Sequence, residues 1–178
     1  MSSVPGWMAD VGVELRSALG DEFRAEAEAD ERAAAALRLR RRSLVDAAIE
    51  HMHRGDLVRA YLPDAIVTGT IVNAATGLLT LAIRDSGRLH VNLSSTIVLS
   101  VVDTSGSDGR SRGPLDPESF LAQLRSIELG GRRVGIETEG RAERVTGTIR
   151  AVARDHALIE RDSEQWYVPL PAIVAVWE

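Results

Sequence analysis

The chain has 178 residues, a net charge of −5 and no cysteine, and 44% of its residues are hydrophobic and 26% charged. This composition is typical of a globular protein, and it excludes disulfides, thiolate catalysis and cysteine-ligated metal sites. The negative charge argues against broad binding to a phosphate backbone. No apolar run approaches the ~20 residues that span a bilayer, and residues 1–10 lack a signal-peptide pattern, so we expect a cytoplasmic protein with no membrane contact.

Residues 1–42 predict a helical arm. Helix-forming residues run from Trp7 to Leu19 and from Asp21 to Arg54, with a break predicted at Gly20-Asp21 and Asp21 as the N-cap of the second helix. The segment 25–42 is rich in Ala, Glu and Arg, and such a helix usually needs a partner.

An apolar stripe along this arm indicates a contact surface, formed by Val11, Leu15, Leu19 and Phe23. The stripe could pack on the rest of its own chain, or it could dimerise or dock a partner. The sequence leaves both interpretations open.

An internal repeat follows the arm. The segment VTGTI at 67–71 recurs at 145–149, and RDS at 84–86 recurs at 161–163. A repeat of this kind indicates two copies of one structural unit, which we assign to residues 43–102 and 116–178. Residues 103–115 between them are rich in Gly and Ser and predict a flexible linker.

Each unit predicts a helix followed by five short strands. In the second unit Asp116 is a candidate N-cap, Pro117 fits the first helical position, and Gly130 marks the end. Five short strands cannot cover both faces of an open sheet, so we expect each unit to roll into a small barrel bent at Gly69 or Gly147. The fold class is therefore α+β, a long helical arm followed by two tandem five-stranded antiparallel barrels, each preceded by a helix. The expected core comprises Val67, Ile71, Leu81, Val91, Leu93, Val145, Ile149, Leu158, Val168 and Leu170.

Short motifs give each unit a resemblance to the Sm-like family, namely the helix followed by Gly55-Asp56-Leu57-Val58 or by Gly131-Arg132-Arg133-Val134. The segment PLPA at 169–172 also fits a src-homology-three-like barrel. The whole chain looks like an uncharacterised actinobacterial family, in which a Trp (here Trp7) and an acidic, Ala-rich helix (22–42) precede a barrel ending in VPLPAI (168–173). The resemblance implies the barrels and no activity. The acidic and Asn positions with which Sm proteins bind RNA fall near 75 and 79 and near 153 and 157, where the residues do not match.

The remaining motifs predict no catalytic or metal site. Glu50-x-x-His53 is a metal-binding spacing that needs a second copy, and the chain has one. His90 and His156 are isolated and are expected at the surface. We expect no enzyme, no cofactor and no metal.

Two clusters could act in binding. Arg38, Arg41 and Arg42 share one side of a helix and could touch phosphates, although pairing with nearby acids is the simpler interpretation. Trp166 and Trp177, with Tyr167, could line an interaction surface, although barrel packing is the simpler role.

The leading hypothesis is a non-enzymatic interaction module, a protein–protein scaffold or adaptor whose partner is a second copy in a homodimer or another protein. The alternative is a nucleic-acid-binding regulator that uses the Arg38–Arg42 cluster, which is not favoured. An enzyme is a distant third, and no small-molecule substrate is evident.

Overall fold

The computed structural model describes residues 6–95, 97–105, 109–140 and 143–178, and for residues 6–22 and 25 it describes the backbone alone. The helices are α1 (Gly6–Arg41), α2 (Leu44–Arg54), α3 (Phe120–Gly130) and the short 3₁₀ helix η1 (Leu170–Ala172). The strands are β1 (Leu57–Tyr61), β2 (Ile66–Ala75), β3 (Leu78–Ile83), β4 (Gly87–Asn92), β5 (Val98–Asp103), β6 (Arg133–Thr138), β7 (Val145–Val152), β8 (His156–Arg161), β9 (Glu164–Pro169) and β10 (Ile173–Trp177).

The helix boundaries differ from the predicted ones. Helix α1 runs without a break through Gly20 and Asp21, and the interruption lies at residues 42 and 43 instead. Ser43 then caps α2, because its side chain accepts a hydrogen bond from Asp46 N while the Asp46 carboxylate accepts one from Ser43 N. Helix α3 is capped by Ser119, not by Asp116. Because α2 and α3 belong to the strand-rich part, the helices do not form one N-terminal arm.

The predicted pair of five-stranded barrels is wrong. The described strands form one antiparallel open sheet in the order β5-β1-β2-β3-β4-β10-β6-β7-β8-β9. Strand β4 does not close against β5, and β9 does not close against β10; β4 pairs with β10 instead, with Val91 opposite Ala175. That pairing satisfies two strand edges that a separate barrel would leave open, which is the physical reason for a continuous sheet.

The repeated segments take equivalent places in this sheet. Val58 pairs with Gly69 in the first half as Val134 pairs with Gly147 in the second. Both glycines allow paired strands to approach closely, β2 to β3 and β7 to β8. A Cβ on Gly69 would lie 2.5 Å from the Ala82 carbonyl oxygen, and one on Gly147 would lie 2.5 Å from the Glu160 carbonyl oxygen. The backbone irregularities recur as well, at residues 71–73 and 149–151.

Two apolar cores lie in the sheet part, and each takes residues from both halves. The first core contains Val174 and Ala175 of β10 beside residues of β1–β4, and the second contains Ala75 and Leu78 beside α3 and β6–β10. Most of the expected core is buried, namely Val67, Ile71, Leu81, Val91, Val145, Ile149 and Val168, whereas Leu93, Leu158 and Leu170 are half-buried.

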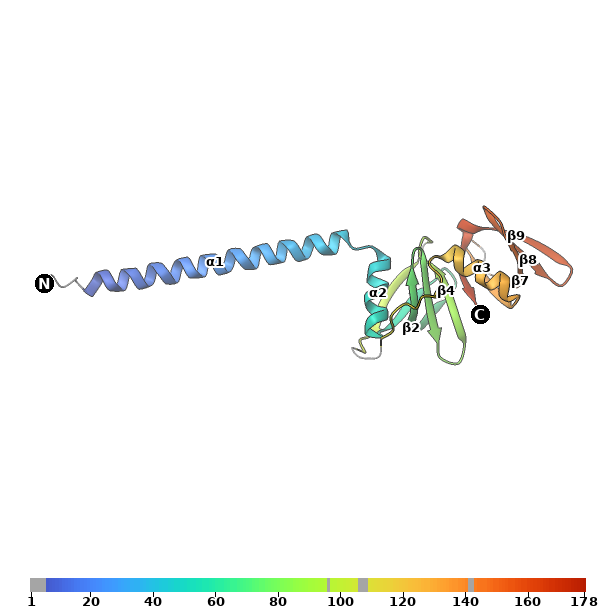
Figure 1. Ribbon diagram of the computed structural model, residues 1–178, viewed down its shortest axis with the longest axis horizontal. Coiled ribbons are helices and arrows are strands. Elements are labelled where there is room, and N and C mark those ends of the chain that lie inside the picture. The colour runs from blue at the N-terminus through green and yellow to red at the C-terminus, as the bar shows by residue number, and fades with distance from the viewer. Residues whose placement is uncertain (1–5, 96, 106–108, 141–142) are drawn as a thin grey trace. The chain divides into compact units, whose positions relative to one another are not determined.

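The chain divides into two compact units, residues 1–42 and 43–178. In the second unit α2 packs on β2, and α3 packs on β7 and reaches β3 and β4 (Figure 1). The segment between the halves is tied to α2 and to the turn after it where it is described, since Arg110 N donates to the Met52 carbonyl and Ser105 N donates to Asp56.

Candidate functional site

The two end strands of the sheet, β5 and β9, are the candidate functional site. Within the described residues each pairs with one neighbour only, β5 with β1 and β9 with β8. Strand β5 exposes Val98 at 63%, Val101 at 41% and Val102 at 44%, and it has no charged residue before Asp103. An uncharged edge rich in β-branched residues is suited to pairing with another strand.

An apolar row extends from β5 across the same face of the sheet. Tyr61 lies opposite both Ile66 and Val98 in adjacent strand pairs, and paired residues in an antiparallel sheet share a face. Ile66 is 67% exposed, and Tyr61 is half-buried. Hydrogen bonds with Arg59 and Ser100 lower the pKa of the Tyr61 hydroxyl. The row is therefore apolar at its ends and carries a polarised hydroxyl in the middle.

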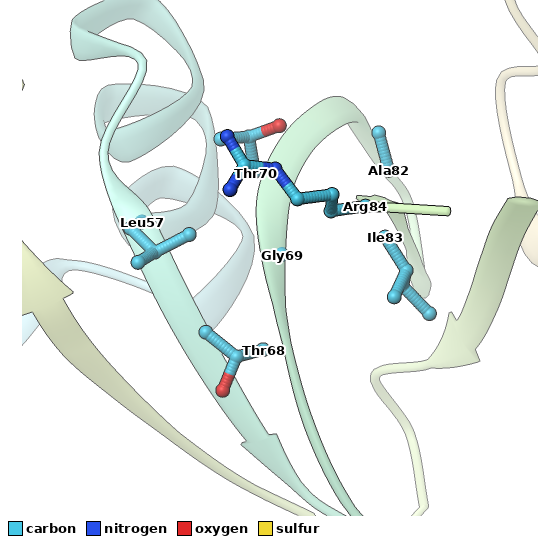
Figure 2. Close-up of a pocket in the computed structure, with 7 residues that line it drawn as sticks. All are labelled: Leu57, Thr68, Gly69, Thr70, Ala82, Ile83 and Arg84. Atoms are coloured by element: carbon cyan, nitrogen blue, oxygen red, sulfur yellow. The ribbon is translucent and has the colours of Figure 1, made fainter. Parts of the chain in front are cut away.

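A hollow of about 630 Å³ continues this face over Gly69 (Figure 2). Its lining comes from three neighbouring strands and the turn after β3: Leu57, Thr68, Gly69, Thr70, Ala82, Ile83 and Arg84. A smaller hollow of about 220 Å³ occupies the equivalent place over Gly147, where Arg133, Glu160 and Arg161 replace the apolar side chains. A hollow thus lies at the close strand approach beside each glycine, and of these two hollows the first has the apolar lining.

A buried polar cluster lies where the halves meet, centred on His90, which is 2% exposed. The prediction of a surface histidine is wrong because β4 pairs with β10 and α3 covers it. His90 Nδ1 lies 3.0 Å from Thr80 Oγ1, and Nε2 lies 3.1 Å from Gln123 Nε2 and 3.3 Å from Glu178 Oε2. Burial lowers the pKa of His90, although the Glu178 carboxylate opposes this. The cavity beside His90 holds about 30 Å³, enough for one water, and the contacts of His90 with Gln123 and Glu178 join the two halves.

The candidate residues of helix α1 are only partly described. Val11, Leu15 and Leu19 lie on the helix, but their side chains are outside the described residues, and Phe23 is 69% exposed. Arg38 and Arg41 are exposed in the last turn, and Arg42 follows the helix and is half-buried.

The two tryptophans do not form one surface. Trp166 lies on β9 and packs against the second core, whereas Trp177 lies on β10 and packs against the first. The Arg144 guanidinium lies 4.0 Å from the centre of a Trp177 ring, and Trp177 Nε1 donates to Glu137 at 3.3 Å. Trp166 belongs to the candidate edge, and Trp177 belongs to the junction.

The Glu50-x-x-His53 motif does not form a metal centre in the described part of the chain. Glu50 forms an ion pair with Arg54 on the same helix, and neighbouring His51 contacts Asp56 at 2.7 Å. No group of three or more metal-ligating side chains occurs among the described residues.

Comparison with known proteins supplies no assignment: no family model matches the chain, and no curated protein matches it. Among the described residues, no helix combines the length and apolar character that a membrane span requires.

The sequence pattern did not identify β5 as a site. Its valines have the alternation and composition of any strand, and their exposure depends on the position of β5 at the end of the sheet. A signal was present in the run of uncharged residues from 97 to 102, which a covered strand and a docking strand share.

Proposed function

We propose that this protein is a non-enzymatic protein–protein interaction module whose docking surface is the β5 edge. The observation that supports the proposal is the exposure of Val98, Val101 and Val102 on a strand that pairs with one neighbour only among the described residues. Proteins commonly protect such an edge with charge, proline or a covering segment. Strand β5 has none of the first two between residues 97 and 102. We propose a cytoplasmic location for this module.

The recognition mode is addition of a strand. Backbone hydrogen bonds to the free side of β5 would supply affinity, and the apolar row of Ile66, Tyr61 and Val98 would select side chains of the partner. The hollow over Gly69 adjoins Thr68 on the same face and extends the apolar surface. The partner is therefore an extended segment with apolar side chains on one face.

Photo-crosslinking tests this proposal directly. A photoreactive phenylalanine analogue at Val98 should give discrete adducts in native-host cells, because the partner strand lies against that side chain. The same analogue at Leu129, which is 88% exposed on α3, is the matched control. If the adducts at position 98 do not exceed those at position 129, β5 is not a docking strand.

A nucleic-acid-binding role is the second candidate, favoured by the exposed Arg38 and Arg41 in the last turn of α1. Each phosphate contact that is lost should reduce the salt slope of binding by about one. We therefore predict that, if this role holds, Arg38→Ala plus Arg41→Ala weakens gel shifts of RNA or DNA and lowers the salt slope. Absence of any shift at low salt would remove this candidate.

A further inference from the structure

The row of side chains that follows the apolar row on this face of the sheet is polar. Residues two apart along a strand share a face, so Ser100 lies on the same face of β5 as Val98. Ser100 is opposite Arg59 of β1, which in turn is opposite Thr68 of β2. An incoming strand on β5 therefore meets an apolar position beside Val98 and a polar position beside Ser100, two residues further along.

Arg59 carries the positive charge of this polar row. It is half-buried, and its Nε donates to Thr68 Oγ1 at 3.4 Å. Arg59 and Ser100 also both form hydrogen bonds with the Tyr61 hydroxyl. These partners are uncharged hydroxyls, so they hold the guanidinium in place beside the edge and do not neutralise it.

No acid among the described residues forms an ion pair with Arg59. Strand β5 has one acid, Asp103, which lies in the row beyond Arg59. The smaller hollow of the second half differs, because Arg150 there pairs with Glu160 of the same chain. A half-buried charge is stabilised by a counter-charge within hydrogen-bonding reach. Arg59 is therefore suited to a carboxylate from another molecule.

The hollow over Gly69 adds a second cation to this face. Arg84 follows β3, and its side chain extends over the hollow beside Thr70 (Figure 2). Arg84 has no ion pair within the part of the chain that the structure describes. Two cations without a counter-charge thus flank the apolar surface, although the whole chain has a net charge of −5. This charge favours an acidic partner over a basic one.

We infer that the partner of β5 is an extended segment of another protein that carries an Asp or Glu two positions from an apolar residue. The apolar side chain would lie beside Val98, and the carboxylate would pair with Arg59 across the small side chain of Ser100. This inference rests on the proposed function and names the chemistry of its partner. It adds one charged position to the otherwise apolar face of the incoming segment.

The spacing of the strands fits this ion pair. Two strand spacings, about 10 Å, separate the backbone of the incoming segment from that of β1, and the side chains of Arg59 and a Glu together span that distance. An acid in the following row of the incoming segment would instead face Asp103, which repels it. The site therefore accepts a carboxylate at one position and disfavours it at the next position on the same face.

Peptide display measures this preference. A library of short random peptides on phage is selected on the full-length protein, and each enriched peptide is tested for crosslinking to the photoreactive analogue at Val98, with the analogue at Leu129 as the control. Peptides that pass should carry an Asp or Glu two positions from an apolar residue. Replacing that acid by its amide should weaken binding, measured by fluorescence anisotropy, roughly 2- to 5-fold, as expected for a partly exposed ion pair.

Charge reversal separates an ion pair from a structural role of Arg59. Full-length Arg59→Glu protein should select Lys or Arg at the position where the wild-type protein selects an acid, because the preferred charge follows the charge at residue 59. Arg125→Gln, on the exposed side of α3, is the matched control and should select the same peptides as the wild-type protein. Thermal unfolding confirms that each variant is folded, and the amide replacement in the peptide decides the question without any protein variant.

Crosslinking in native-host cells gives the second measurement. With the photoreactive analogue at Val98, Arg59→Lys should retain the adducts because it keeps the charge. Arg59→Gln should reduce them roughly 2- to 5-fold, and Arg125→Gln should leave them unchanged.

The outcomes are separable. Peptides and adducts at position 98 that show no preference for an acid, or no dependence on the charge at residue 59, would overturn the inference and keep the proposed function. Absence of both peptides and adducts at position 98 would reject the proposed function and the inference together.

Discussion

His90 is a neutral group held between the halves, since burial lowers its pKa below the ordinary value of about 6.5. The folded protein therefore binds its proton less readily than the unfolded chain does. The contribution of His90 to the free energy of unfolding is fully present above pH 6.5, and it falls as the pH drops below that value. Glu178 beside it and the charges of Arg88 and Arg132 modulate the shift without reversing it.

We predict that the melting temperature falls between pH 7.5 and pH 5.5 and that His90→Gln flattens this dependence. The slope for one proton is at most about 1.4 kcal/mol per pH unit. His53→Gln is the matched control, because His53 is exposed at the end of α2. Thermal unfolding at several pH values measures the effect, and an equal slope in the His90→Gln protein would contradict it.

The narrow space between β2 and β3 requires a glycine at position 69. We predict that Gly69→Ala lowers the free energy of unfolding by about 1–3 kcal/mol, because its Cβ would collide with the Ala82 carbonyl at 2.5 Å. Gly135→Ala should be tolerated, since its Cβ would meet nothing closer than 3.7 Å. Chemical denaturation of both variants compares them, and equal losses would show that strand propensity, not space, is responsible.

At the scale of the element, helix α3 shows which of two candidate caps is used. Ser119 Oγ accepts a hydrogen bond from Ala122 N at 3.1 Å, whereas Asp116 accepts one from Gly113 N and pairs with Arg110. The Gly113 N–H is the main reason that the pKa of Asp116 is lowered. Asp116 therefore orders the turn before the helix and does not cap it.

We predict that Ser119→Ala lowers the free energy of unfolding by about 1 kcal/mol, the usual cost of a lost N-cap. Asp116→Asn keeps an acceptor for Gly113 N and should cost less. Urea denaturation separates the two, and a larger loss for Asp116→Asn would show that the turn held by Asp116 stabilises the fold more than the Ser119 cap does.

The sequence predicted the strands well because alternation is a local signal. Val91 lies between the polar residues His90 and Asn92, and it is buried as expected. It did not predict the pairing of β4 with β10, because nothing in either strand specifies a partner more than eighty residues away. The same limit applies to Leu158, which has a core-like side chain but lies on a face that no described segment covers fully.

At the scale of the molecule, the candidate site was hidden from the sequence for a related reason. Trp166 and Trp177 are close in the sequence and lie in different cores, whereas Val98 and Ile66 are separated in the sequence and flank the same tyrosine. Sequence proximity thus predicted the wrong cluster. The proposed docking edge depends on the position of β5 at the end of the described sheet, which no local pattern specifies.

We predict that the photo-adducts at position 98 survive removal of helix α1, because the proposed docking strand lies within residues 43–178, which form a compact unit. Crosslinking of the full chain and of a chain starting at Ser43, each with the photoreactive analogue at Val98, makes the comparison. If only the full chain gives adducts, helix α1 carries the contact, as the stripe from Val11 to Phe23 first suggested.

The sharing of β10 between two cores has a consequence for synthesis. Val174 and Ala175 complete the first core, yet the ribosome adds them after the other described strands of the sheet have been made. The first half must therefore wait with part of its interior open until residues 173–177 have left the exit tunnel. During that interval the edge of β4 is free to pair wrongly, so a nascent chain halted at Pro169 should be a substrate for chaperones that hold exposed strands.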